Sequence, residues 1–223
     1  MGNGTGLVLL FTCCWAARYA SFVLNENFVF LGLVFGAIGV GSYLVAILQG
    51  RVQPNRLSWF ILGLAPLLAF AAEIDEGVGL RSVMTFWVGF GPLLIFFASF
   101  VNKSAYWKLT RFDIVCASLS VLALVLWQLT GSGNITIALT IIADGLAVLP
   151  ILVKSWRFPH TEVPWPFLGA MANSAIALLV LDRFTFADLA WPTYIFVSCL
   201  ILVGTLLVRK HVVDAPETNG AGA

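Results

Sequence analysis

The sequence predicts an all-α integral membrane protein, a bundle of seven transmembrane helices made of two parallel three-helix repeats joined by a linker helix. Three observations predict this class. Of the 223 residues, 60% are hydrophobic and only 10% are charged, whereas soluble domains are about half apolar and a quarter charged. Apolar stretches long enough to cross a bilayer recur along the chain. The two halves of the chain also resemble each other.

The composition excludes several other classes of protein. So few charges cannot solvate the surface of a soluble chain of this length. The formal net charge of +1 provides no basic field for nucleic acid. The four cysteines lie in apolar segments without a Cys-x-x-Cys spacing, and both histidines lie at the ends of predicted helices. We therefore expect no metal site and no cofactor.

The apolar stretches define the seven predicted spans, each about 20 residues long as a helix across hydrocarbon requires. They are helices because lipid cannot satisfy the backbone N–H and C=O groups of an open strand. In chain order the spans are Phe28–Gln49, Leu57–Ile74, Ser82–Val101, Asp113–Thr130, Ile135–Lys154, Pro164–Leu181 and Ala187–Val208. An earlier apolar segment, Gly6–Leu24, is interrupted by Arg18 and fits an eighth span or an interfacial helix equally well.

The distribution of charge predicts the topology. Basic residues gather in alternate connections and after the last span: Arg51, Arg56, Lys103, Lys108, Arg111, Lys154, Arg157, Arg209 and Lys210. The remaining connections carry only Arg81 and Arg183 among basic residues. By the positive-inside rule the richly basic side is cytoplasmic. The seven-helix core then begins outside the cell, and the C-terminus lies in the cytoplasm.

An internal repeat divides the chain into segments. The matched positions are Gly39 with Gly145, Trp59 with Trp165, and Gly63 with Gly169. Because each repeat has an odd number of spans, a linker helix is needed to give both the same orientation, with an interface and a cavity between them. The predicted segments are an N-terminal extension (1–27), a first repeat (28–101), a linker region (102–134), a second repeat (135–208) and a disordered tail (209–223).

The loop motifs carry a family resemblance. Leu149-Pro150-Ile151 precedes Lys154-Ser155, and Trp165 then opens the next span; in the first half Trp59 follows a loop that contains Pro54. With its three-plus-one-plus-three arrangement, the chain resembles the PQ-loop superfamily, which includes the SWEET sugar transporters, over roughly residues 28–208. The stretch Gly39–Phe70 also resembles uncharacterised bacterial membrane proteins, which implies a bacterial inner membrane. Neither half has the Pro-Gln pair of that superfamily.

Asp144 is the leading candidate for a functional residue. It lies halfway along the fifth span, about 15 Å of helix from either end. A charged residue at mid-membrane is costly and usually faces a cavity or a partner. We hypothesise that Asp144 binds a substrate amine or hydroxyl, or carries a coupled proton. The alternative is a protonated carboxyl group hydrogen-bonded within the bundle.

Further candidates flank Asp144. Asn173, followed by Ser174, lies in the middle of the sixth span, and its amide can contact substrate or form an interhelical hydrogen bond. The other proposed substrate-binding residues are Ser42, Tyr43, Trp87, Tyr194 and Ser198. Proline residues at positions that interrupt spans are either hinges or tolerated kinks; they are Pro66, Pro92 and Pro150.

Two residue sets are expected to have structural roles. Trp59, Trp107 and Trp165 lie near span ends, so we expect them in the aromatic belts at the membrane interfaces. Small residues on the first span allow close helix packing. We expect this packing within the first repeat, and the alternative is that these residues form the face of a homo-oligomer. These small residues are Gly32, Gly36, Gly39 and Gly41.

The leading functional hypothesis is a transporter of a small polar solute, a sugar, an amino acid or an organic acid, by alternating access between the repeats. Its partners would be that solute and the lipid bilayer. A receptor or sorting protein of the same architecture is the alternative. An intramembrane enzyme is less well supported, because the sequence lacks a nucleophile elbow and a metalloprotease motif. A retinal protein would need a lysine within the last span, whereas Lys210 follows it.

Overall fold

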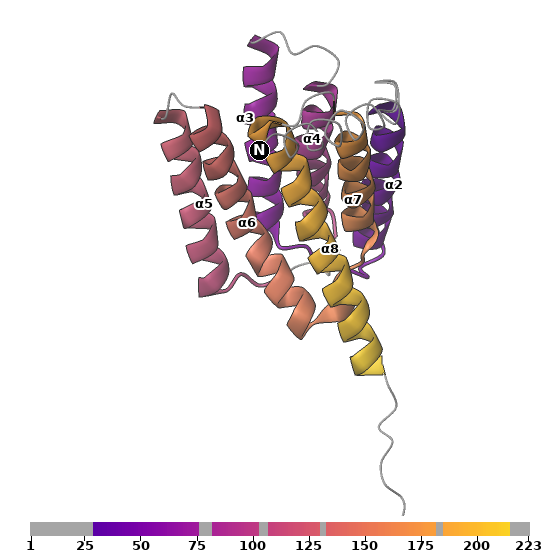
Figure 1. The fold of residues 1–223 in the computed structure, drawn as a ribbon. Helices are drawn as coiled ribbons and strands as arrows, with labels where there is room; N and C mark the ends of the chain where they lie inside the picture. The colour runs from indigo at the N-terminus through magenta and orange to yellow at the C-terminus, as the bar shows by residue number, and fades with distance from the viewer. Residues whose placement is uncertain (1–28, 76–81, 103–106, 130–132, 182–184, 215–223) are drawn as a thin grey trace, which may run out of the picture.

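The computed structural model describes residues 29–75, 82–102, 107–129, 133–181 and 185–214 (Figure 1). Over these ranges the chain is all-helical, with seven α-helices, one short 3-10 helix and no strand. The helices are α2 (Val29–Leu48), α3 (Arg56–Asp75), α4 (Ser82–Ala98), α5 (Arg111–Leu129), α6 (Gly133–Arg157), η3 (Pro159–Thr161), α7 (Trp165–Leu179) and α8 (Phe186–Asp214). The segment Gly6–Leu24 and the tail beyond residue 214 lie outside the described residues.

Each predicted span overlaps a helix; α4 and α7 end before their predicted spans do, at Ala98 and Leu179, whereas α6 and α8 run further than predicted. The largest extension is in α8, which continues past Val208 to Asp214. Four helical segments are long and apolar enough to cross a membrane, and α3, α4 and α7 contribute shorter apolar stretches. The four long segments are Phe30–Leu48, Arg111–Leu129, Ile137–Arg157 and Leu189–Val213.

The outward surfaces of the long helices are apolar. Large hydrophobic side chains are exposed on α2, α5 and α8, and examples are Phe30, Val34, Ile38, Ile114, Val115, Leu122, Leu200, Ile201 and Leu207. A soluble protein rarely exposes continuous apolar surface of this kind, whereas a lipid environment requires it. The helical fold and its apolar exterior therefore support a membrane protein.

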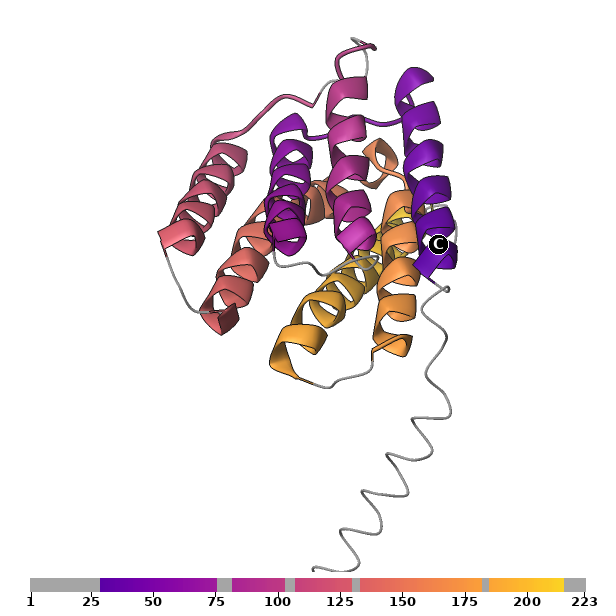
Figure 2. The same cartoon turned by 90° about the horizontal axis from the view of Figure 1, so that it is seen from above.

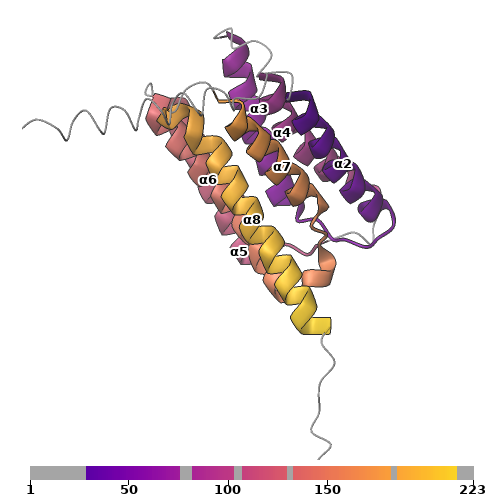
Figure 3. The same ribbon diagram turned by 45° about the vertical axis from the view of Figure 1, so that its right-hand side comes forward.

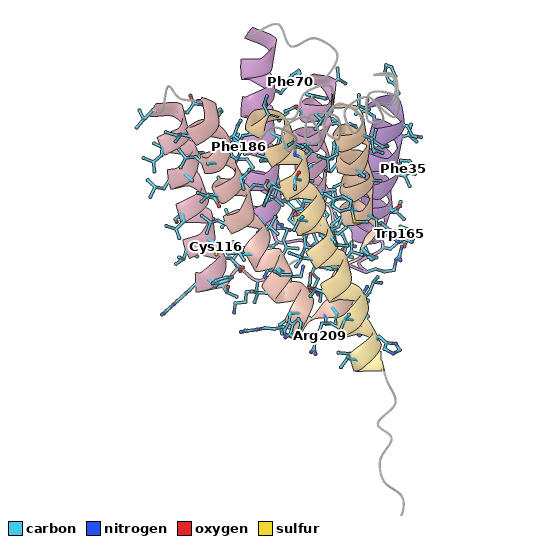
Figure 4. The ribbon with its side chains drawn as sticks, in the orientation of Figure 1. Phe35, Phe70, Cys116, Trp165, Phe186 and Arg209 are labelled. Atoms are coloured by element: carbon cyan, nitrogen blue, oxygen red, sulfur yellow. The ribbon has the colours of Figure 1, made fainter. Side chains whose placement is uncertain are left out.

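Consecutive helices run in alternating directions, so every second connection lies at the same end of the bundle (Figure 1). We call the lower end in this view the basic end. Its described basic residues are Arg51, Arg56, Lys108, Arg111, Lys154, Arg157, Arg209 and Lys210. Figure 4 places Arg209 near this end and Phe186 near the opposite end. In Figure 3, α8 continues beyond the other helices at the basic end.

The helices form two facing layers, seen from above in Figure 2. In one layer α4 lies between α2 and α3, and in the other α8 lies between α6 and α7. Contacts of α2 with α7 and of α3 with α6 join the layers, so six helices form a closed ring. The remaining helix, α5, packs outside this ring against α6 and α3.

Glycines bring α2 and α7 into backbone contact. A Cβ atom added to Gly39 would lie 2.7 Å from the carbonyl oxygen of Trp165, and one added to Gly169 would lie 2.7 Å from that of Phe35. The prediction that the α2 glycines pack within the first repeat is therefore wrong for Gly39. Gly36 does meet Trp87 of α4, but Gly39 packs against the other layer, because the ring places α2 beside α7.

The helix ends at the basic end are capped by side chains. Asn102 Nδ2 donates hydrogen bonds to the carbonyl oxygens of Ile47 and Leu48, at 3.2 and 3.0 Å. Arg209 Nε similarly donates to the carbonyl oxygen of Trp156 at 2.9 Å. The last carbonyl groups of a helix have no partner within it and carry partial negative charge, so amide and cationic donors stabilise these ends.

Candidate functional site

A cavity with a volume of about 110 Å³ lies inside the six-helix ring. Every described α-helix except α5 contributes to its wall. The lining residues are Gly36 and Val40 of α2, Trp59 and Leu62 of α3, Trp87, Val88, Pro92 and Ile95 of α4, Asp144, Val148 and Ile151 of α6, Pro166, Phe167, Ala170 and Asn173 of α7, and Ile195, Ser198, Cys199 and Leu202 of α8. The wall is mostly apolar, and Asp144 is the charged residue in it.

Asp144 is 4% exposed and faces α8 from α6. The hydroxyl group of Tyr194 donates a hydrogen bond of 2.8 Å to its Oδ2 atom. A carboxylate offers about four acceptor positions, and Tyr194 occupies one of them. The carboxyl group is thus fixed in orientation by one donor and keeps acceptor capacity toward the cavity that it lines.

Asn173 lines the same cavity from α7 and is 5% exposed. Its Oδ1 atom is buried without a hydrogen-bond partner. An unsatisfied buried polar atom costs about 1–3 kcal/mol, so its presence beside a cavity marks an acceptor that a bound molecule can use. The neighbouring Ser174 is also buried but is not among the lining residues.

The structure brings some of the other predicted site residues to the cavity. Trp87 and Ser198 are part of its wall, and so is Pro92 of the three proposed hinges. Tyr194 is not a lining residue, but its hydroxyl group donates a hydrogen bond to Asp144, which is one. Pro66 and Pro150 lie within α3 and α6 away from the lining.

Ser42 and Tyr43 lie outside the cavity, contrary to the prediction. Ser42 Oγ donates to the carbonyl oxygen of Ile38 within α2. Tyr43 is fully buried, and its hydroxyl group donates to Glu162 Oε2 at 2.6 Å. Ser42 follows the lining residue Val40 by two positions and so points to another side of α2, whereas Tyr43 lies nearly one turn further toward the connections at the basic end.

Trp59 also departs from its prediction. It is 4% exposed and lines the cavity, rather than facing a membrane interface. Its ring stacks on Phe167 with a centroid distance of 6.0 Å and is tilted against Tyr43 at 5.2 Å. Trp165, which the predicted repeat pairs with Trp59, is exposed, so only the second tryptophan of the pair has the exposure expected of an aromatic belt.

A buried charged cluster lies at the basic end and was not predicted from the sequence. We call it the basic-end cluster; its residues are Tyr43, Gln53, Lys154, Glu162 and Lys210. Lys154 Nζ lies 2.6 Å from Glu162 Oε1, with the two side chains 1% and 0% exposed. Lys154 also donates to the carbonyl oxygen of Gln53. Lys210 donates to the backbone carbonyl oxygen of Glu162 at 2.8 Å.

The basic-end cluster joins the two layers close to the cavity. Tyr43 and Gln53 belong to α2 and the connection after it, whereas Lys154, Glu162 and Lys210 come from α6, the segment after η3, and α8. The ring of Tyr43 packs against Trp59, which is part of the cavity wall. One signal in the sequence could have indicated the cluster: Glu162 is one of the few acids, with Asp113 and Asp214, on the side where most basic residues gather.

Comparisons of the chain with models of protein families, with curated proteins and with solved structures find no match. The chemistry of the site therefore follows from its geometry. A small molecule within the ring would meet a fixed carboxyl group, an amide oxygen without a partner, and aromatic and aliphatic side chains.

Proposed function

We propose that the protein is a membrane transporter of a small solute, working by alternating access between two parallel three-helix repeats. The repeats are α2–α4 and α6–α8, with α5 as the linker. One observation carries the proposal: the cavity is lined by all three helices of each repeat and by no residue of α5. A binding site at the interface between two repeats is the arrangement that alternating access requires.

The packing order supports the repeat. In each set the third helix lies between the first and the second. The contacts between the two sets are also related. The first helix of the first set, α2, contacts the second helix of the second set, α7, and likewise α6 contacts α3. The resemblance of the sequence to the PQ-loop superfamily rests on the three-plus-one-plus-three arrangement, and we propose that superfamily as the family of this chain.

The basic-end cluster supports a closed gate at one end of the cavity. Two hydrogen bonds connect the two repeats beyond Trp59, one from Tyr43 to Glu162 and one from Lys154 to the carbonyl oxygen of Gln53, and the ion pair holds Lys154 and Glu162 together on the side of the second repeat. To open a path to this end, Tyr43 and Gln53 must separate from Lys154 and Glu162. Since Gly39 and Gly169 hold α2 and α7 in backbone contact, the repeats would rock about that seam and part elsewhere.

The proposed membrane placement follows from the charges. The basic end lies in the cytoplasm of a bacterial cell by the positive-inside rule, and the apolar outward faces of α2, α5 and α8 contact lipid. Alternating access would then expose Asp144 first to one side of the membrane and then to the other. A proton carried on this carboxyl group would couple transport to a pH gradient.

A reconstitution experiment tests the proposal. The full chain is placed in liposomes, and uptake of sugars, amino acids, organic acids and amines is measured with and without a pH gradient. We expect one class to accumulate, with loss of uptake in Asp144→Asn. Ser118→Ala is the matched control, because Ser118 lies on the exposed face of α5. Uptake that is flat for all four classes would overturn the proposal and favour a receptor.

A further inference from the structure

The substrate class can be narrowed from the wall of the cavity, on the premise of the proposed transport function. We propose that the cavity binds a small organic amine in its ammonium form. The ammonium group would contact Asp144 and Asn173, and a compact apolar body would lie against Trp59, Trp87 and Phe167. Each part of this proposal rests on a separate feature of the described lining.

The charge of the lining favours a cation. Asp144 contributes a carboxyl group, and none of the lining residues is a lysine, an arginine or a histidine. A buried carboxylate without a counter-ion is strongly unfavourable, and a bound cation with N–H donors compensates it. An anionic solute would add a second negative charge at low dielectric constant, where like charges repel most strongly.

The unpaired oxygen atom of Asn173 favours a molecule with a hydrogen-bond donor, while Trp59 Nε1 is a buried donor without a partner on the aromatic side of the wall. Asn173 Oδ1 is buried without a partner on α7, and Asp144 lines the cavity from α6. An ammonium group has three N–H donors and no acceptor, so it can satisfy acceptors from two helices at once. A hydroxyl group has a single donor and would leave one of the two acceptors unsatisfied.

The aromatic wall favours the same class. Trp59, Trp87 and Phe167 line the cavity, and the faces of aromatic rings attract ammonium groups and the methylene groups next to them. The polar side chains with oxygen atoms in the lining are Asp144, Asn173 and Ser198. A polyhydroxylated solute would therefore bury hydroxyl groups against apolar side chains, at a cost for each unpaired group.

The volume limits the size of the amine. A cavity of about 110 Å³ excludes large solutes and admits a molecule of a few carbon atoms. The cavity thus suits an amine with a short branched carbon chain. Isobutylamine, isobutanol and isobutyrate are a matched set of probes, because they share the carbon skeleton and differ in the polar group.

Equilibrium binding to the full chain in lipid nanodiscs tests the proposal, measured by isothermal titration calorimetry. We expect isobutylamine to bind at least about tenfold more tightly than isobutanol or isobutyrate, given the usual strength of hydrogen bonds to charged groups. Asp144→Asn should remove this preference. Trp87→Leu should weaken amine binding without creating any preference for the alcohol, and Ser118→Ala should bind as the parent protein does.

The outcomes separate this inference from the transport proposal. Equal binding of amine and alcohol, unchanged amine binding in a folded Asp144→Asn variant, or no binding of any probe would overturn the inference. If Asp144→Asn fails to fold, the Trp87→Leu variant and the three probes still decide it. Amine binding without uptake in liposomes would overturn transport alone, and uptake of sugars or acids but not amines would overturn the amine assignment alone.

Discussion

Lys154 and Glu162 form an ion pair at 2.6 Å in which both side chains are almost completely buried. The two residues are close in sequence, on either side of η3, but the contacts that complete the pair come from the other layer of helices. Tyr43 of α2 donates to Glu162, and the carbonyl oxygen of Gln53 accepts from Lys154. The pair is therefore part of the interface between the two layers.

Replacing one member of this pair should destabilise the protein. In Glu162→Gln, the Lys154 ammonium group loses its counter-ion while remaining buried, and breaking a buried pair in this way typically costs about 3–5 kcal/mol. The free energy of unfolding, measured in detergent with a denaturant, should fall accordingly. Lys108→Met should change it little, because Lys108 is an exposed basic residue at the same end.

The double variant Lys154→Met/Glu162→Gln separates pair loss from a general loss of packing. It leaves no buried charge in the pair, so it should be more stable than Glu162→Gln alone. Equal stability of Glu162→Gln and the parent protein would contradict the structural role of the pair.

The contact between α2 and α7 should be intolerant of a methyl group. In Gly169→Ala the new Cβ atom would lie 2.7 Å from the backbone carbonyl oxygen of Phe35, which cannot rotate away as a side chain would. Overpacking of this kind typically costs about 1–3 kcal/mol, and thermal unfolding in detergent should show a lower midpoint. Gly41→Ala, also on α2, is the control, because its Cβ atom would meet no atom within 4 Å. A similar midpoint for both variants would argue against the close seam.

The helical segments could be predicted from the sequence because a membrane span is a local property. About 20 consecutive apolar residues and their polar boundaries specify a helix without knowledge of its neighbours. The setting of Asp144 was also predictable, since a carboxyl group far from both span ends needs a cavity or a partner. It has both, in the cavity lining and in Tyr194.

The order of the helices could not be predicted in the same way, and residues whose roles depend on it were misplaced. With α4 between α2 and α3, the first turn of α3 points into the ring, so Trp59 lines the cavity although its sequence position suggested an interface. The sequence pattern assigned no role to Glu162. Its burial depends on Lys154, Tyr43 and Lys210, which come from three helices.

Tyr194 should strengthen amine binding through Asp144. Its hydroxyl group donates to Oδ2 at 2.8 Å, which favours the ionised carboxylate that an ammonium group requires. Tyr194→Phe removes this donor, and a hydrogen bond to a charged group is worth about 1.5–3 kcal/mol, so the affinity for isobutylamine should fall about tenfold or more. Thr193→Ala tests the neighbouring exposed position on α8 and should leave the affinity unchanged. Unaltered binding in Tyr194→Phe would show that the hydrogen bond does not tune the site.

Amine binding should weaken as the pH falls. A proton and an ammonium group compete for the Asp144 carboxylate, whereas an alkylamine itself stays charged well above neutral pH. The other titratable side chains facing Asp144 are Tyr194 and Cys199 of α8, and both are ordinarily neutral under acidic conditions. Titrations of isobutylamine between about pH 8 and pH 5 should therefore show falling affinity that Asp144→Asn abolishes. An affinity independent of pH would contradict competition at this carboxyl group.

The proposed gate predicts that opening the basic-end cluster exposes the cavity from that end. Cys199 lines the cavity, so it can report access once Cys13, Cys14 and Cys116 are replaced by serine. A membrane-impermeant thiol reagent applied to the basic end of oriented vesicles should react slowly with Cys199 while Lys154 and Glu162 are paired. In Glu162→Gln the ion pair is lost, and the reaction should be faster, by about tenfold if gate opening becomes easier by ~1.4 kcal/mol.

Isobutylamine should slow the labelling of Cys199 in the parent protein and in Glu162→Gln, because it occupies the space beside this residue. If Glu162→Gln were unfolded instead, isobutylamine would give no such protection. Lys108→Met should label at the parent rate, since Lys108 is exposed and no part of the cluster. Equal labelling of the parent protein and a folded Glu162→Gln variant would mean that the pair stabilises the basic end without controlling access to the cavity.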